Sequence, residues 1–241
     1  MKINKNIQIA IDGPVGAGKS TVAYLLAQKL NILYIDTGSM YRAVALLAII
    51  NNLDFYNEAD IMAILKKSTI KLLPPFKKSR FCTVLLNNKN VTKKIRTQKV
   101  SWGSSAVAVL PQVRKHLVKL QKRIAKAQSV VMEGRDITTV VLPQADLKIY
   151  MTASVEARAK RRHKELQKKG IKQTFSATLK ETKKRDRQDS NRETDPLTVT
   201  QEVWLLKTSN LTINQVITAI IKRLIKLDFL EKSDIIKTLN E

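Results

Sequence analysis

The order of apolar and polar positions along this 241-residue chain predicts strands that alternate with helices. Residues 7–12 (IQIAID) form a short apolar run typical of a buried strand, and residues 21–30 (TVAYLLAQKL) have the spacing of an amphipathic helix. Further strands are expected at 32–35, 129–132, 145–150 and 203–206, and further helices at 40–50, 98–109, 111–127, 155–168, 176–189 and 213–227. This alternation is typical of a parallel sheet with crossover helices, so the predicted fold class is α/β.

Residues 53–100 differ from the rest of the pattern. They contain a helical segment at 58–67 and two short strands at 69–73 and 81–86, followed by an Asn-rich turn. We expect these residues to form an inserted lobe of a single domain whose core is 1–52, 101–155 and 190–227. The sequence does not decide whether the tail, 228–241, forms one more helix.

Composition excludes several classes of protein. Hydrophobic residues make up 44 % of the chain, enough for a sizeable core, and no apolar run approaches the roughly 18 residues of a membrane helix. The N-terminus, MKINKN, lacks the apolar stretch of a signal peptide. The only cysteine, Cys82, excludes an internal disulfide and fits a reducing compartment. We therefore expect a cytoplasmic protein that does not enter a membrane.

The charge is unusual, because 44 Lys and Arg against 20 Asp and Glu give a net charge of +24. A polyanionic partner such as RNA, bound nucleotide phosphates, and a general drift of surface composition each explain such an excess. The lysines occur in dispersed pairs, no run reaches five or six, and aromatic residues make up only 5 %. This pattern favours surface drift, with weak non-specific RNA affinity and no specific nucleic acid partner.

A phosphate-binding loop joins the first predicted strand to the first helix. Its eight residues match G-x-x-x-x-G-K-[ST] at every fixed position and are followed by Thr21; they are Gly13, Pro14, Val15, Gly16, Ala17, Gly18, Lys19 and Ser20. Glycines let the backbone approach a phosphate, and the helix N-terminus presents unpaired N–H groups. Lys19 is expected on the β- and γ-phosphates of ATP, and Ser20 is expected to ligate Mg²⁺.

The loop does not identify the acceptor of the phosphoryl group, but longer stretches of the sequence give evidence about it. GPVGAGKST, YIDTGSMYRAVAL, EGRDITTVVLPQADLKIYMTAS and RDRQDSNRETDPL resemble the bacterial type of cytidylate kinase, and the resemblance extends over about residues 7–225. It implies a P-loop kinase fold with a parallel five-stranded sheet, in which 53–100 bind the nucleoside monophosphate and 156–189 form a short lid. It also implies transfer of phosphate from ATP to CMP or dCMP, and we expect a monomer.

The resemblance also implies roles for individual residues. Positions that match the family's monophosphate and cytosine contacts are Thr37, Tyr41, Arg42, Ser105, Arg114, Arg135, Asp136, Arg185, Asp189 and Arg192. Of these, Arg135, Arg185 and Arg192, together with Lys19, are expected to be catalytic. The basic lid helix implies ATP contacts by Arg158 and Arg162, with Arg161 beside them.

Physical chemistry supports this assignment independently. Joining two polyanions requires several fixed cations, and guanidinium groups match phosphate oxygens better than ammonium groups do. The attacking atom is already an anionic phosphate oxygen, so no general base is needed. Asp136 can accept a hydrogen bond from the exocyclic amine of cytosine, whereas uracil presents an acceptor at that position.

Some positions depart from the family pattern, and two other functions stay open. Thr138 stands where the family usually has glycine, Lys93 and Lys94 replace acidic residues, and Lys207 replaces an aspartate. None of these departures falls on a residue assigned to chemistry. The alternatives are a kinase for another small acceptor such as UMP, and an RNA-binding protein with a vestigial kinase site. The relative preference for CMP, dCMP and UMP does not follow from the sequence.

Overall fold

A computed structural model describes residues 1, 3, 5–74, 82–126, 128–168 and 170–231. The chain divides into two compact units. The first combines Met1–Ile32 with Ser129–Glu241, and the second is Leu33–Gln128. The lobe expected at 53–100 lies within the second unit, and the expected lid, 156–189, lies within the first. Among the described residues, no helix has the length and apolar character needed to cross a membrane.

Parallel strands form the centre of the first unit. They are β1 (Gln8–Asp12), β6 (Val130–Glu133), β7 (Leu147–Thr152) and β8 (Trp204–Lys207), and β1 pairs in parallel with both β6 and β7. With β2 (Leu33–Asp36), the strand order is β2-β6-β1-β7-β8. Ile9, Ala10 and Ile11 have no exposed surface, as expected for a central strand covered on both faces. The predicted α/β fold with a parallel five-stranded sheet is confirmed.

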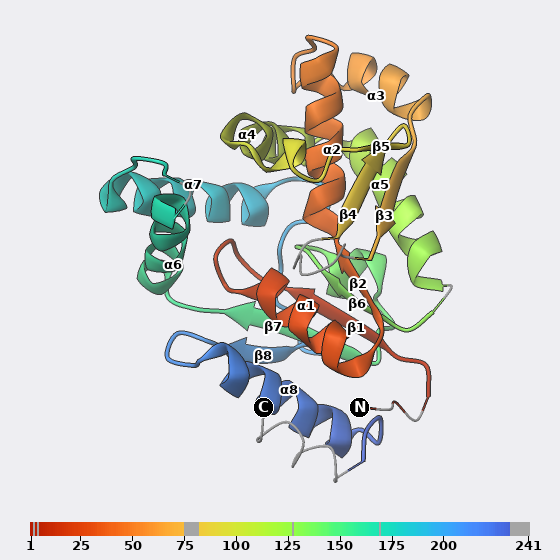
Figure 1. The fold of residues 1–241 in the computed structure, drawn as a ribbon, viewed down its shortest axis with the longest axis vertical. Coiled ribbons are helices and arrows are strands. Elements are labelled where there is room, and N and C mark those ends of the chain that lie inside the picture. The colour runs from red at the N-terminus through yellow and green to blue at the C-terminus, as the bar shows by residue number, and fades with distance from the viewer. Residues whose placement is uncertain (2, 4, 75–81, 127, 169, 232–241) are drawn as a thin grey trace. The chain divides into compact units, whose positions relative to one another are not determined.

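The α-helices that the structure describes in this unit are α1 (Lys19–Leu30), α6 (Val155–Lys168), α7 (Phe175–Asn191) and α8 (Ile213–Lys226). Helices α1 and α8 lie side by side on one face of the sheet, and α6 packs against α7 (Figure 1). A capping box of Thr212 and Gln215 begins α8. After α6, Gly170 has a φ of 72° and donates its N–H to the carbonyl of Gln167, so glycine ends this helix as predicted.

The second unit is built around a buried helix, α2 (Thr37–Ile50), in which every side chain from Val44 to Ala48 is buried. Helices α3 (Glu58–Lys66), α4 (Gln98–Val107) and α5 (Pro111–Lys126) pack against α2. A small antiparallel sheet follows the order β3 (Ile70–Leu73), β4 (Thr83–Leu86) and β5 (Lys89–Asn90). The Cys82 thiol is buried and donates a hydrogen bond to the carbonyl of Tyr34, so this residue has a packing role.

Short elements account for most differences from the expected pattern. The strand β5, the 3₁₀ turn η1 (Lys94–Arg96) and the π-helical turn η2 (Ile137–Val141) were not predicted, because two to five residues carry too little periodicity. The predicted Asn turn is present, with Asn87 and Asn88 at φ of 50° and 62°. Residue 81 of the predicted strand 81–86 and residues 232–241 of the tail lie outside the described residues.

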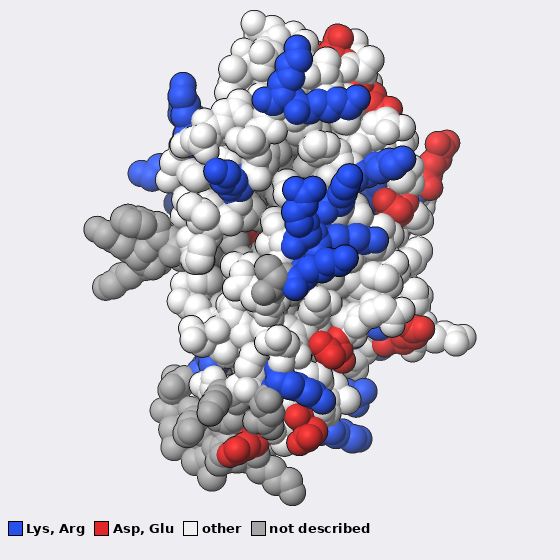
Figure 2. Space-filling view, turned by 90° about the vertical axis from the view of Figure 1, so that its right-hand side faces the viewer, with Lys and Arg blue, Asp and Glu red and all other residues white. Residues whose placement is uncertain are grey.

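The fold gathers part of the positive charge on single helix faces. Helix α5 contains no acidic residue, and its exposed lysines follow helical spacing at Lys115, Lys119, Lys122 and Lys126. Figure 2 views the side on which α5 lies and shows Lys and Arg side chains crowded together there. Lysines that are dispersed in the sequence therefore gather on one face of α5.

Candidate functional site

The phosphate-binding loop occupies the turn between β1 and α1, and backbone geometry explains its glycines. Gly13 has a φ of 146°, and a Cβ atom placed on it would lie 2.0 Å from the carbonyl oxygen of Met151. Gly18 is the N-cap of α1 with a φ of 95°, and no side chain caps the helix there. The first N–H groups of α1 thus remain available to an anion.

Lys19 is held inside the loop. Its Nζ donates to the carbonyl oxygens of Gly13 and Pro14 at 2.6 and 3.0 Å, and only 5 % of the residue is exposed. Burial, helped by the positive charge of Arg135, lowers the pKa of Lys19 to about 7. A bound phosphate would supply the negative charge that favours the protonated amine.

Two buried carboxylates end the central strands beside the loop. Glu133 ends β6 and accepts a 2.7 Å hydrogen bond from the hydroxyl of Ser20. Asp12 ends β1, and its carboxylate accepts the N–H groups of Ile137 and Thr138 and the Thr138 hydroxyl, at 2.7–3.0 Å. Burial raises the pKa of Asp12 despite these donors.

The Ser20–Glu133 pair fits the needs of Mg²⁺. This ion takes oxygen ligands and is usually held by one or two carboxylates together with phosphates and waters. The Ser20 hydroxyl and the Glu133 carboxylate are two such oxygen groups in hydrogen-bond contact. No cluster of three or more His, Cys, Asp or Glu side chains with metal-binding geometry occurs in the described part of the chain.

The rest of the site in the first unit consists of arginine side chains close to carboxylates. Arg135 Nε lies 2.6 Å from Asp189 Oδ2. Burial opposes the charge on both groups, but their attraction prevails, so the pKa of Arg135 rises and that of Asp189 falls. Arg185 and Arg192 also lower the pKa of Asp189 through their positive charge.

Arg192 connects this cluster to Asp136. Its guanidinium donates to the carbonyl of Asp195, and its Nη2 lies 3.8 Å from Asp136 Oδ1. The side chains of Arg192 and Asp136 are only 4 % and 6 % exposed. The structure therefore brings together five of the predicted residues in this unit: Arg135, Asp136, Arg185, Asp189 and Arg192.

The three arginines of α6 have different surroundings. Arg158 is buried, donates to the carbonyl of Val15 in the loop, and forms a two-point ion pair with Asp186 of α7 at 2.8 and 3.0 Å. Arg161 donates to the carbonyls of Ala17 and Thr208. Arg162 forms a half-exposed ion pair with Glu165 on its own helix. Two of the three side chains thus hold the loop itself.

The second unit contains its own group of predicted residues at the start of α2. Asp36 caps this helix by accepting hydrogen bonds from the N–H and hydroxyl of Ser39, and Arg96 Nη2 lies 3.8 Å from Asp36 Oδ2. Thr37, the first residue of α2, is buried.

One turn farther along α2, Tyr41 and Arg42 contact other helices of this unit. The Arg114 guanidinium carbon lies 5.7 Å from the centre of the Tyr41 ring, and Arg114 also donates to the carbonyl of Ala108. Arg42 donates to the hydroxyl of Ser101 at 3.4 Å. Ser105 lies on the same helix as Ser101, α4. The predicted residues of the second unit therefore cluster on α2, α4 and the start of α5.

With this geometry established, comparison with known proteins identifies the family. The family model described as cytidylate kinase matches residues 9–226, nearly the whole chain. The chain belongs to the cytidylate kinase family. It is 45 % identical to the cytidylate kinase of Carboxydothermus hydrogenoformans over 90 % of this chain and 96 % of that protein. The cytidylate kinase of Clostridium botulinum strain Langeland is 46 % identical over 88 % of this chain and 94 % of that protein. Among solved structures, the shikimate kinase from Bacteroides thetaiotaomicron aligns with a TM-score of 0.44 at 12 % identity, over 92 % of this chain and 97 % of that one.

The departures from the cytidylate kinase pattern have simple local explanations. Thr138 lies in η2 without a positive φ, so no glycine is required there, and its hydroxyl adds a hydrogen bond to Asp12. Lys93, Lys94 and Lys207 are exposed. Each replacement is therefore compatible with the local backbone.

Three residues that sequence reasoning missed lie in these sites: Asp12, Glu133 and Arg96. The first two had a usable signal, because each lies at the end of a predicted buried strand and is followed by glycine, where α/β proteins bind ligands. Arg96 lies in a predicted loop, so nothing in the sequence distinguished it.

Proposed function

We propose that this chain transfers the γ-phosphoryl group of ATP to CMP or dCMP, giving ADP and CDP or dCDP. The observation that carries the proposal is the phosphate loop with Lys19 buried inside it and Ser20 bonded to Glu133, in a member of the cytidylate kinase family. A loop of this kind binds a triphosphate, and the family membership indicates the acceptor.

The donor half of the reaction belongs to the loop. Its residues Gly13 to Thr21 would hold the phosphates of ATP, with Lys19 on the β- and γ-phosphates. Ser20 and Glu133 would hold Mg²⁺, which neutralises charge on the phosphates when bound. Arg158 would act by fixing the loop through Val15, whereas Arg162, paired with Glu165, would contact ATP only after that pair separates.

The acceptor half would use the two other clusters. Arg135, Arg185 and Arg192 would bind the monophosphate of CMP, with Asp189 keeping Arg135 oriented. Thr37, Tyr41, Arg42, Ser105 and Arg114 would contribute further contacts to the nucleotide. The pairing of Arg135 with Asp189 and of Arg192 with the carbonyl of Asp195 fixes the direction of both guanidinium groups before substrate arrives, which is the preorganisation that phosphoryl transfer needs.

No residue has to remove a proton for this reaction. The acceptor oxygen of CMP is anionic, so the chain's task is to align it with the γ-phosphorus and to stabilise charge during transfer. Arg135 is suited to that task because the carboxylates around it keep it charged even though it is buried.

Base selection is assigned to Asp136. This carboxylate is nearly buried, and an acceptor in such a place favours the amine of cytosine over the carbonyl of uracil. A coupled assay with CMP, dCMP, UMP, AMP and shikimate tests the proposal, with CMP or dCMP expected as the preferred acceptor. Asp136→Ala should reduce the preference for CMP over UMP. If UMP serves as well as CMP in the unaltered protein, the base assignment is wrong.

The oligomeric state and compartment stay predictions. We expect a monomer that uses ATP with Mg²⁺, and light scattering on the purified chain measures the oligomeric state. Tight RNA binding that persists in Lys19→Ala and falls steeply with salt would instead favour the RNA-binding alternative.

A further inference from the structure

Helix α7 separates its acidic and basic residues onto different faces. Its acids are turned toward partners in the same unit: Asp186 pairs with Arg158, Asp189 pairs with Arg135, and Glu181 accepts from Gln173. The remaining cations of the helix, apart from Arg185, lie on another face. They are Lys180, Lys183, Lys184 and Arg187, and all four are exposed.

The spacing of these four cations places them on one narrow surface. Their positions follow i, i+3, i+4 and i+7, which covers an arc of about 100° around the helix and about 10 Å along it. Within the described part of the chain, none of the four forms a hydrogen bond or ion pair. Four like charges in this space repel one another, so the surface favours a multiply charged anion.

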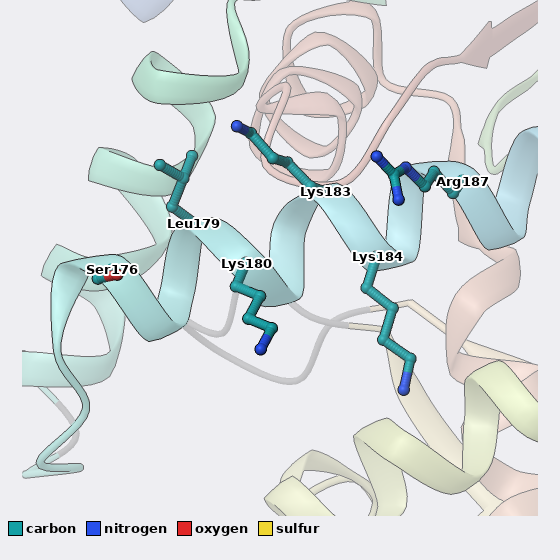
Figure 3. A pocket seen from close by; sticks show the side chains of 6 residues that line it. All are labelled: Ser176, Leu179, Lys180, Lys183, Lys184 and Arg187. Atoms are coloured by element: carbon teal, nitrogen blue, oxygen red, sulfur yellow. The ribbon is translucent and has the colours of Figure 1, made fainter.

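The same four side chains, together with Ser176 and Leu179, line a cavity of about 540 Å³ that is open to solvent. Figure 3 shows Lys180 and Lys184 extending on one side of α7 and Leu179, Lys183 and Arg187 on the other, while Ser176 lies nearest the helix start. Binding sites for small molecules commonly enclose about 300–1,000 Å³. The cavity therefore has room for a ligand larger than a single phosphate ion.

We propose that this cationic face of α7 is a second oligophosphate-binding site, separate from the phosphate loop, which takes a linear triphosphate or a nucleoside triphosphate. The three lysines supply mobile point charges, and Arg187 supplies a planar group that can hold two oxygens of one phosphate. Ser176 adds a hydroxyl, and Leu179 adds an apolar contact for the remainder of a nucleotide.

The residues favour an oligophosphate over a nucleic acid strand. Proteins that bind single strands combine cations with aromatic side chains on which bases stack, and none of the described residues that line this cavity is aromatic. The cations are also concentrated within two helical turns, which matches a compact chain of phosphates. The site does not depend on the proposed kinase activity, because it uses none of the residues assigned to that reaction.

Binding measured without turnover tests the proposal. The full chain carrying Lys19→Ala removes the loop lysine, and calorimetric titration with inorganic tripolyphosphate at low ionic strength then reports remaining sites. Besides any binding to the acceptor-site arginines, we expect a saturable site that weakens by about tenfold or more when Lys180, Lys183, Lys184 and Arg187 are all changed to Gln, equivalent to about 1.4 kcal/mol. A matched control changes Lys115, Lys119, Lys122 and Lys126 of α5 to Gln, which removes the same charge from another exposed helix face. That variant should bind within about twofold of its parent, since it changes none of the residues that line the cavity.

Three results would overturn the inference. The first is the absence of saturable binding of tripolyphosphate to the Lys19→Ala protein, and the second is an equal loss of affinity in the α7 and α5 variants. The third is binding of single-stranded RNA that depends on the α7 cations when binding of tripolyphosphate does not. ATP in place of tripolyphosphate tells whether a nucleoside is accepted. If the fourfold variant does not fold, the double variant Lys180→Gln/Lys184→Gln removes one side of the cavity, and a loss of about threefold is then expected.

Discussion

The hydroxyl of Ser20 lies 2.7 Å from Oε1 of Glu133 and donates a hydrogen bond to it. One group comes from the first turn of α1 and the other from the end of β6, so the contact depends on two segments more than a hundred residues apart. It places a hydroxyl and a carboxylate together beside the phosphate loop, which is the basis for proposing that both serve Mg²⁺.

Replacing Glu133 with Gln should weaken the use of Mg²⁺ while keeping the fold. The amide oxygen can still accept from Ser20, but the negative charge that attracts the cation is gone. We expect activity at limiting Mg²⁺ to fall by about 10–100-fold, with partial recovery at high Mg²⁺. Titration of initial rates with Mg²⁺ checks this, and Glu202→Gln, which removes an exposed carboxylate, is the control. An unchanged Mg²⁺ dependence would remove Glu133 from the metal site.

Much of the first unit was predictable because its signals are local. The loop motif, the apolar strand before it and the helix after it are contiguous, and their backbone geometry follows from Gly13 and Gly18. The sequence could not indicate that Glu133 contacts Ser20, or that Arg161 supports the loop through Ala17, because those contacts depend on how distant segments pack. The resemblance implied that Arg158 contacts ATP, but the sequence could not indicate that its side chain pairs with Asp186.

Binding of ATP should take up a proton near pH 8.5, and Lys19 is the group that accepts it. Burial holds the pKa of Lys19 at about 7 in the free protein, below its ordinary 10.5, so at about pH 8.5 the amine is largely neutral. The phosphates of ATP favour the charged amine and raise its pKa, so binding draws a proton from the buffer. Uptake should approach one proton per ATP at this pH and vanish near pH 5.5, where the amine is already charged.

Calorimetric titrations in buffers of different ionisation enthalpy measure this proton uptake. The Lys19→Met variant should show none and should lose about 10²–10³-fold in kcat, as when one preorganised donor is removed from a transition state. If the native protein at pH 8.5 gives the same binding enthalpy in every buffer, the depressed pKa of Lys19 is not real.

Asp189→Asn should destabilise the fold as well as reduce activity. The change leaves Arg135 without its main counter-charge, and losing one partner of a fully buried pair costs about 3–5 kcal/mol. Both side chains keep some exposure, 21 % and 15 %, and Glu133 and Asp12 also attract Arg135, so we expect the lower end of that range. Urea unfolding measures the loss, and Glu202→Gln, in an exposed ion pair, should change stability little.

The lowered pKa of Asp189 determines how the stabilisation by the Arg135–Asp189 ion pair changes with pH. The pKa of Asp189 is lowered in the folded protein, so its stabilisation is fully present above the ordinary carboxyl pKa of 3.8 and is lost as the pH falls through the lower folded value. The gap in unfolding free energy between the native chain and Asp189→Asn should therefore narrow only in acid. A gap that stays constant from pH 7 to pH 3 would contradict the ion-pair explanation.

Thr138→Val should separate the hydrogen bond of this hydroxyl from the shape of the side chain. Thr138 donates to the buried carboxylate of Asp12 through both its N–H and its hydroxyl, and valine keeps only the first. We expect a loss of about 1–2 kcal/mol in unfolding free energy. Thr139→Val makes the same chemical change at a half-buried neighbour and should have a smaller effect. Equal losses would show that packing, not the bond to Asp12, sets the cost.

Gly13→Ala should be far more damaging than Gly18→Ala, although both glycines belong to the loop. A Cβ on Gly13 would lie 2.0 Å from the carbonyl oxygen of Met151, in a strand that pairs on both sides and cannot move away, and the φ of 146° is unfavourable as well. A Cβ on Gly18 meets nothing within 4 Å, so only its φ of 95° is costly. We expect about 4 kcal/mol or more for Gly13→Ala, against about 1–2 kcal/mol for Gly18→Ala. Urea unfolding of the two variants measures the difference, and similar losses would mean that the close approach of Gly13 to β7 does not determine the choice of glycine.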